Sequence, residues 1–173
     1  MARTAVRPVR ASQVEMTELV LPNDTNRLGN LLGGRLMHWI DIAAAIAASR
    51  HTNRVCVTAS VDELHFLNPV KQGEVVVLRA SVNRVFRTSL EVGVNVTTEN
   101  TLTGDRKHTN TAYLTFVAID DDGKPVAAAP VRPVTALEKR RYRDAARRRE
   151  IRLLHRRRDA RRDARRDAPS PSK

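Results

Sequence analysis

The chain has 173 residues, enough for one domain with a sizeable core and an appendage but too few for two cores. Its net charge of +12 suggests nucleic-acid binding, but 16 of its 31 Lys and Arg residues lie from residue 139 onward, so the rest of the chain is nearly neutral. The single cysteine, Cys56, excludes an internal disulfide framework and is expected as a small buried residue in a reducing compartment. No segment has the pattern of a signal peptide or the length of a membrane span, which predicts a cytoplasmic protein.

The first elements expected along the chain are a leader, a strand and a helix. Residues 1–12 are expected to be a flexible leader, and a short strand follows over Val14–Leu21. The stretch from there to Gly34 is rich in glycine and leucine without a clean period, which indicates an ordered loop. A helix is expected over Arg35–Arg50, and its apolar residues lie nearly all round it, which predicts burial on several sides.

Val- and Thr-rich segments separated by turn residues follow the helix. We expect strands over Arg54–Val61, His65–Val70, Glu74–Phe86, Ser89–Thr98 and Lys107–Asp120. The clearest alternation is that of Leu90, Val92, Val94 and Val96. One helix followed by long antiparallel strands predicts an α+β fold in which the sheet wraps the helix, with residues 13–135 as the domain.

The composition changes abruptly to arginine, aspartate and alanine from Ala136, and the repeat R-R-D-A occurs three times between Arg157 and Ala168. Large apolar side chains are too few here for an independent core. Residues 136–173 are therefore expected to form a tail that is helical at least from Ala136 to about Leu154 and frays into a solvated or disordered end.

An acid within the apolar helix is the main candidate for chemistry. Asp41 lies among Met37, Ile40, Ile42 and a row of alanines. An ionised carboxylate buried without a partner costs many kcal/mol, so Asp41 must line a pocket or meet a partner. The alternatives are a catalytic carboxylate and an acid that pairs with an arginine across an interface.

The order and spacing of several short motifs resemble one family. The motifs are Pro22-Asn23-Asp24-Thr25-Asn26, Gly29-Asn30, Gly33-Gly34, Met37, Asp41, Val57-Thr58-Ala59-Ser60-Val61-Asp62, Phe66, Pro69-Val70, Gly73-Glu74 and Arg87-Thr88-Ser89-Leu90-Glu91. As a set, over residues 14–135, they resemble the hotdog-fold acyl-CoA thioesterases, which include bacterial YciA-like enzymes and brain-type cytosolic acyl-CoA hydrolases. The resemblance implies a hotdog subunit, a homodimer with active sites at its interface, and trimers of such dimers.

The resemblance also implies the site residues. The catalytic aspartate of the family falls on Asp41 and its loop Asn or Asp on Asn30, which would come from the other subunit. The residues themselves agree, because the amides of Gly33 and Gly34 at the helix start can bind an oxyanion, and Asp41 follows seven residues after Gly34. Asp41 would act as a general base or as a nucleophile, and the sequence leaves both open.

The coenzyme A arm is expected at the turn Arg87, Thr88 and Ser89, where the alternative is a solvated turn arginine. His38 could tune Asp41, but a subunit contact is the favoured interpretation. The histidines show no metal-ligand spacing, and no cofactor is expected, because coenzyme A is part of the substrate. The rival hypothesis is a non-catalytic acyl-CoA-binding or oligomerising module whose arginine-rich tail binds nucleic acid or an anionic surface, although nucleic acid is disfavoured by the interleaved aspartates.

Overall fold

A five-stranded antiparallel sheet curls around one long helix. The structure is a computed structural model that describes residues 5–62, 64 and 68–166. Its elements in chain order are β1 (Arg7–Pro8), η1 (Val9–Ser12), β2 (Val14–Leu19), η2 (Pro22–Asp24), α1 (Gly33–Thr52), β3 (Val55–Val61), β4 (Val75–Val85), β5 (Ser89–Glu99), β6 (Arg106–Ile119), β7 (Val131–Arg132) and α2 (Ala136–Arg166). The large sheet has the order β2-β4-β5-β6-β3, and β1 pairs in parallel with β7.

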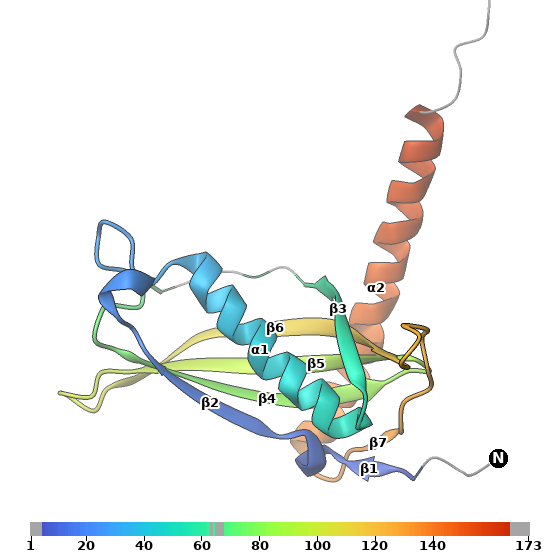
Figure 1. Cartoon of the computed structure of the whole chain (residues 1–173), viewed down its shortest axis with the longest axis horizontal. Coiled ribbons are helices and arrows are strands. Elements are labelled where there is room, and N and C mark those ends of the chain that lie inside the picture. The colour runs from blue at the N-terminus through green and yellow to red at the C-terminus, as the bar shows by residue number, and fades with distance from the viewer. Residues whose placement is uncertain (1–4, 63, 65–67, 167–173) are drawn as a thin grey trace, which may run out of the picture.

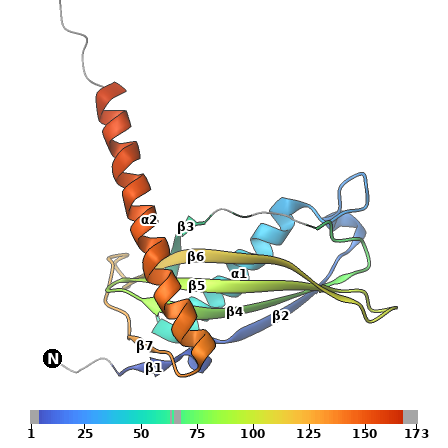
Figure 2. The ribbon, with the colours of Figure 1, turned by 180° about the vertical axis from the view of Figure 1, so that it is seen from behind.

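The core lies between the inner face of the sheet and α1. Figures 1 and 2 show α1 on one face of the sheet and α2 on the other. The expected alternation in β5 is confirmed, since Leu90, Val92, Val94 and Val96 are all fully buried. On α1, Ala43, Ala44, Ala47 and Ala48 are also fully buried, and these small side chains let the helix approach the sheet closely.

Helix α1 is two residues longer at each end than expected. It ends at Thr52, where Asn53 adopts the left-handed conformation (φ 52°) and its N–H bonds to the Ser49 carbonyl oxygen at 2.8 Å. Three apolar residues of α1 are less buried than the apolar pattern predicts, since Met37, Ile42 and Ile46 are 36–42% exposed in the single chain. Ile42 and Ile46 are about one turn apart on the same side of α1, whereas Met37 lies about half a turn round the helix from Ile46.

Helix α2 covers the range expected at the least, Ala136 to about Leu154, and continues to Arg166. It begins with a capping box, in which Glu138 accepts a hydrogen bond from the Thr135 N–H at 3.0 Å and its own N–H donates to the Thr135 hydroxyl at 3.2 Å. The helix packs on the sheet and is not simply solvated. Its first part crosses the outer face of the sheet and its last part projects beyond the body (Figure 2).

A buried ion-pair network fastens α2 to the sheet. Glu91 on β5 is fully buried and accepts hydrogen bonds from Arg148 at 2.7 and 3.2 Å and from Arg152 at 3.0 Å. Arg152 also contacts both carboxylate oxygens of Asp62, at 2.9 and 2.7 Å, just after β3. The Arg148 guanidinium stacks on the Tyr113 ring at 3.6 Å. We name Glu91, Arg148, Arg152 and Asp62 the α2 clamp.

Gly93 makes room for one further partner of this clamp. Asn83 donates a hydrogen bond to Glu91 Oε1 at 3.1 Å, and its side-chain amide lies over Gly93. A Cβ added at residue 93 would stand 2.7 Å from Asn83 Nδ2. The absence of a side chain at Gly93 therefore allows Asn83 to reach Glu91.

The expected flexible leader is ordered over its described second half. Ser12 is fully buried, donates to the Val9 carbonyl oxygen at 2.7 Å and accepts from the Val82 N–H at 2.9 Å. Arg7 donates to the His51 carbonyl oxygen at 2.7 Å. These are specific bonds of polar groups, which is why hydropathy did not reveal them.

Two expected strands differ from the structure. The first ends at Leu19 and not at Leu21, because Pro22 opens the short η2 turn. Of the strand expected over His65–Val70, residues 65–67 lie outside the described residues and 68–70 form no strand. In the described part of the chain, no helix combines the length and apolarity needed to cross a membrane.

Candidate active site

Asp41 and Thr58 form the centre of the candidate site. Asp41 lies half-buried in the middle of α1, and the Thr58 hydroxyl donates a hydrogen bond of 2.8 Å to its Oδ1. Thr58 is on the edge strand β3, beside a register shift between Thr58 and Ser60. A bulge of this kind re-aims side chains at a sheet edge, and here it accompanies a hydroxyl that faces the helix. The carboxylate is thus partly satisfied within the chain and partly open.

The start of α1 offers free backbone donors beside open space. The first turn is formed by bonds from the Arg35 and Leu36 amides to the Leu32 carbonyl oxygen, at 3.0 and 3.1 Å. Among the described residues no acceptor bonds the Gly33 or Gly34 amide, and a Cβ built at Gly34 would meet nothing within 4 Å. These amides carry the positive end of the helix dipole and suit an oxygen that gains negative charge.

A buried acid holds the loop against this helix start. Asp24 is 6% exposed, pairs with Arg35 at 2.8 Å and accepts the Leu21 N–H at 3.1 Å. The Leu32 N–H, in turn, donates to the Asp24 carbonyl oxygen at 2.9 Å. The approach of the chain to Gly33 is therefore fixed before the helix begins.

Asn30 lies in this loop and makes no hydrogen bond to Asp41 within the described part of the chain. It forms a bridge with Lys71, and its Oδ1 is buried without a hydrogen-bond partner among the described residues. Asn26 organises the turn around it, because its Oδ1 accepts the N–H groups of Leu28 at 2.9 Å and Asn30 at 3.2 Å. The predicted catalytic role of Asn30 stays a prediction.

The predicted coenzyme A residues lie at another part of the surface. The turn between β4 and β5 is tied to neighbouring segments through the carbonyl oxygens of Arg87 and Thr88, which accept from Ala128 and Ala118 at 3.0 Å each. The Phe86 N–H donates to the Ser89 carbonyl oxygen at 2.8 Å, and the Arg87 side chain is exposed. No hydrogen bond or ion pair of the described residues joins this turn to Asp41 or Gly34.

Neither His38, nor Cys56, nor a cluster of metal ligands adds to the site around Asp41 in the described structure. His38 is exposed and makes no hydrogen bond to Asp41 in the described structure. Burial raises the pKa of the half-buried Cys56 thiol, which contacts the Thr52 hydroxyl at 3.2 Å, so this thiol is a poor nucleophile. The described residues contain no group of three or more His, Cys, Asp or Glu side chains placed to hold a metal.

Sequence reasoning missed two residues of interest. Thr58 belongs to the motif Val57-Thr58-Ala59-Ser60-Val61-Asp62, but nothing in a Val- and Thr-rich strand indicates that one hydroxyl faces an acid on the helix. Asn26 was also in a quoted motif, and its role in shaping the Asn30 turn shows only in the structure.

A sheet that wraps a helix bearing a half-buried aspartate, with open glycines at the helix start, defines a hotdog-fold protein with a hydrolase-like site. The model of the thioesterase superfamily matches residues 28–104. The uncharacterized acyl-CoA thioester hydrolase YkhA of Bacillus subtilis is 45% identical over 129 residues, which cover 75% of each chain. The chain therefore belongs to the hotdog acyl-CoA thioesterase family.

Other relatives are longer or have known structures. Mouse acyl-coenzyme A thioesterase 11 is 40% identical over 147 residues, and these span 84% of this chain but only 25% of that protein. A solved apo-hexameric acyl-CoA thioesterase is 42% identical, with a TM-score of 0.85, over 87% of this chain and 97% of its own. The acyl-CoA hydrolase of Staphylococcus aureus, solved with butyryl coenzyme A and coenzyme A, is 35% identical with a TM-score of 0.85, over 90% of this chain and 95% of its own.

The Staphylococcus aureus enzyme has also been solved with single alanine replacements of an aspartate, a threonine and an asparagine. Its aspartate and threonine are as far apart in sequence as Asp41 and Thr58 are here. Its asparagine precedes that aspartate by the same distance as Asn26 precedes Asp41. The spacing thus points to Asn26, and not only to Asn30, as the loop amide to consider.

Proposed function

We propose that this protein hydrolyses acyl-CoA thioesters to a carboxylic acid and coenzyme A, with Asp41 as its catalytic carboxylate. The observation that carries the proposal is the half-buried Asp41, which is held by Thr58 and follows on the same helix from free backbone amides. The substrate class is supported by the relatives reported above, which are named acyl-CoA thioesterases or hydrolases and one of which was solved with butyryl coenzyme A.

The chemistry follows from these positions. The thioester carbonyl oxygen would accept hydrogen bonds from the helix-start amides, principally Gly34, and these bonds strengthen as the oxygen becomes negative. As a base, Asp41 takes a proton from water while the water oxygen bonds to the carbonyl carbon, and the carbon–sulfur bond then breaks to release the thiolate. As a nucleophile, Asp41 itself bonds to that carbon, releases the thiolate, and gives an anhydride that water cleaves.

The loop amides would complete the site. Asn26 and Asn30 lie in one short turn before α1, and the Oδ1 atom of Asn30 is buried with no hydrogen-bond partner among residues 5–62, 64 and 68–166. Either side-chain amide, contributed by a neighbouring subunit, can orient the water or bond the thioester oxygen. Arg87, Thr88 and Ser89 remain the proposed contacts of the coenzyme A arm, with the exposed Arg87 guanidinium as the phosphate-binding group.

An oligomer is part of the proposal. Exposed apolar residues of α1 and of the edge strand β3, where Val55, Val57 and Val61 are 43–64% exposed, offer surface that a second copy would cover. Relatives solved as hexamers support an assembly of several copies. In this protein we propose dimers in which each copy contributes to the site of the other. A reducing cytoplasm suits the single thiol of Cys56, and the proposed reaction uses only water, a carboxylate and backbone amides.

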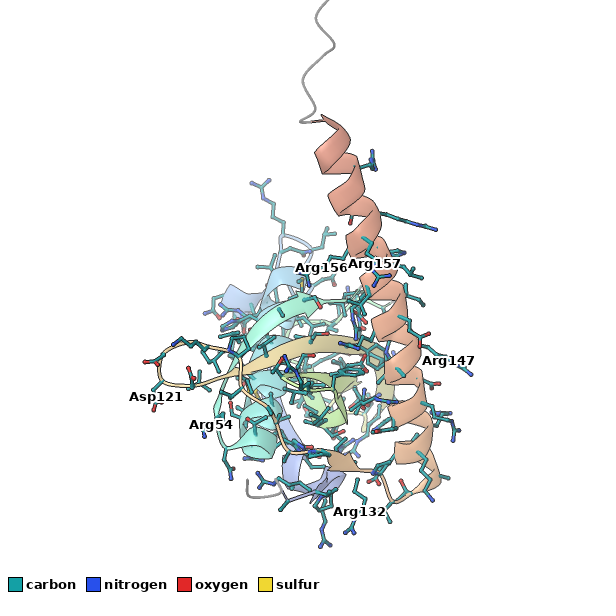
Figure 3. All side chains as sticks on the ribbon, turned by 90° about the vertical axis from the view of Figure 1, so that its right-hand side faces the viewer. Arg54, Asp121, Arg132, Arg147, Arg156 and Arg157 are labelled. Atoms are coloured by element: carbon teal, nitrogen blue, oxygen red, sulfur yellow. The ribbon has the colours of Figure 1, made fainter. Side chains whose placement is uncertain are left out.

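The test is thiol release from acyl-CoAs of short to long chain length by the purified protein. We expect turnover that falls by at least about a hundredfold in Asp41→Asn, with unchanged unfolding midpoint and oligomeric state. Asp121→Asn is the matched control, because Asp121 is an exposed acid in the turn after β6 (Figure 3). Binding of acyl-CoA without hydrolysis by the intact protein would contradict the proposal and favour an acyl-CoA-binding module.

Isotope incorporation separates the two routes. In a single turnover with enzyme in excess and in ¹⁸O-labelled water, the base route places the label in the product acid. The nucleophile route leaves the first product unlabelled if water attacks the carboxyl carbon of Asp41, and then the label appears in the enzyme.

A further inference from the structure

A pocket on the outer face of the sheet is separate from the site around Asp41. It has a volume of about 520 Å³ and lies between the first part of α2 and strands β4, β5 and β6. Helix α1, which carries Asp41, is on the opposite face of the sheet, as a comparison of Figures 1 and 2 shows for the helix. Its volume falls within the range of small-molecule sites in proteins. We call it the outer-face pocket.

The charge that lines the outer-face pocket is strongly unequal. Four arginines reach it, Arg79 from β4 and Arg140, Arg141 and Arg148 from α2, against the single carboxylate of Asp144. Arg148 is already held by Glu91 in the α2 clamp. In the described part of the chain, neither Arg140 nor Arg141 has an ion-pair partner.

A third guanidinium can be recruited at little cost. Arg79 pairs with Glu15 at 2.7 Å, but the two side chains are 55% and 58% exposed. Exposed ion pairs contribute little to stability, because water solvates both charges when they separate. Arg79, Arg140 and Arg141 therefore offer guanidinium groups, from two elements, that a bound anion can share.

The floor of the pocket carries hydrogen-bonding groups in register. Asn95 stands opposite Arg79 on one side and opposite Thr111 on the other. The Asn95 side-chain amide nitrogen lies 3.2 Å from Nδ1 of His108, and His108 Nε2 lies 3.2 Å from the Thr111 hydroxyl. Thr111 lines the pocket, and a hydroxyl both donates and accepts, so it can offer a hydrogen to an acceptor oxygen there.

The phenol ring of Tyr113 at the pocket is covered. Tyr113 lies under the Arg148 guanidinium at 3.6 Å, so it offers no free face for stacking a base. The recognition elements that remain are guanidinium groups and a hydroxyl donor, which match the oxygens of phosphate. We infer that the outer-face pocket binds a small phosphate-bearing anion, from a diphosphate to a mononucleotide in size, through Arg140, Arg141 and Arg79.

The phosphate has two possible sources. One is a separate phosphate compound, and the other is the phosphate-bearing end of an acyl-CoA held at the site of a neighbouring copy. The second source rests on the proposed thioesterase function, whereas the first does not. Both use the same contacts in the pocket.

The test is calorimetric titration of the full-length protein with inorganic pyrophosphate and with ADP at low salt and near neutral pH. Arg140→Gln/Arg141→Gln removes the two unpaired guanidinium groups of the pocket. Arg143→Gln/Arg147→Gln is the matched control, since it removes the same charge from exposed residues of the same helix that do not line the pocket. Figure 3 shows Arg147 pointing away from the body.

We expect the wild type and the control to bind both probes, and the pocket variant to lose about tenfold or more in affinity. Thr111→Val, which keeps the shape of the side chain but removes its donor, should weaken binding with all arginines in place. Absence of pyrophosphate and ADP binding in the wild type would overturn the proposal. Equal losses in the two double variants would also overturn it, because they would show attraction to general positive charge.

Kinetics separate the two sources. A raised KM for acyl-CoA with unchanged kcat in Arg140→Gln/Arg141→Gln, but not in the control, assigns the pocket to the phosphates of the substrate. Lost pyrophosphate binding with an unchanged KM assigns it to a separate phosphate compound. The titrations need no turnover, so a protein without thioesterase activity would leave the pocket test intact.

Discussion

The Thr58 hydroxyl donates a 2.8 Å hydrogen bond to Oδ1 of Asp41 and so joins the edge strand β3 to the central helix α1. The bond leaves the other carboxylate oxygen of Asp41 without a hydrogen bond in the described chain. It also fixes the orientation of the carboxylate, which a productive attack on a thioester requires.

Loss of this bond should lower activity while the fold is retained. Thr58→Val removes the donor but keeps the shape, and a hydrogen bond to a charged group is worth about 1.5–3 kcal/mol. We expect kcat/KM in thiol release to fall by about tenfold or more, whereas Thr58→Ser, which keeps the hydroxyl, should stay near the wild type. Wild-type activity in Thr58→Val would show that the bond does not position Asp41.

Gly34→Ala should separate stability from activity. Nothing lies within 4 Å of the position a Cβ would take, and the glycine is within a helix, where alanine is favoured by up to about 1 kcal/mol. The unfolding midpoint in urea should therefore stay constant or rise. If a thioester approaches this backbone, the added methyl group should raise KM or lower kcat, and unchanged kinetics would place the substrate elsewhere.

Glu91→Gln should destabilise the protein far more than the same change at Glu15. Glu91 is fully buried between Arg148 and Arg152, which are 22% and 20% exposed, and removal of one charge from such a network costs about 3 kcal/mol. Glu15 pairs with Arg79 at the surface, so Glu15→Gln should cost less than about 1 kcal/mol. Urea unfolding measures both, and proteolysis should cut α2 faster in Glu91→Gln. Similar small losses in the two variants would show that the α2 clamp adds little.

Stability should fall on mild acidification because of His51. This side chain is fully buried and its Nε2 contacts the Ala129 carbonyl oxygen at 2.9 Å. Desolvation lowers its pKa below the ordinary value of 6.5, with the nearby Arg7 adding to the effect and the bond to Ala129 opposing it. Between the folded and unfolded pKa values the unfolded chain binds more protons, so the free energy of unfolding decreases as the pH falls below about 6.5.

The matched variant for this prediction is His51→Gln, whose amide can donate to the Ala129 carbonyl oxygen but does not titrate. Its free energy of unfolding should depend less on pH over the same range. A wild type and a variant with the same pH dependence would assign the acid sensitivity to other groups.

The sequence predicted the body of the fold well because one face of each long strand is buried. The sequence predicts the ends of β4, β5, β6 and α1 to within two residues of the observed ends. Alternation in a strand and apolar residues in a helix are direct consequences of burial, so both patterns are visible in the sequence. Asp41 stood out for the related reason that an acid in such a helix needs an explanation.

The packing of α2 on the sheet could not be predicted from the hydropathy pattern. Its apolar contacts are few: Ala145 is small, and the Tyr142 ring packs against the core beneath Arg84 of β4. The other contacts are made by arginines that meet Glu91, Asp62 and the Tyr113 ring. An arginine that covers a sheet cannot be told in the sequence from one in solvent. Truncation of the tail from about residue 140 would remove Arg148 and Arg152, the partners of Glu91, so substitutions of exposed arginines are a better test of the tail.

Gly93 and Asn83 constrain each other's substitution in homologous sequences. A side chain at residue 93 is compatible with the fold only if Asn83 moves or is replaced by a smaller residue, because the two would stand 2.7 Å apart. That replacement would take a donor from Glu91, and only Arg148 and Arg152 would then hold its charge. Homologues that keep the buried glutamate should therefore retain the glycine and the asparagine together, and those that lose one should lose the other or acquire a new donor from α2.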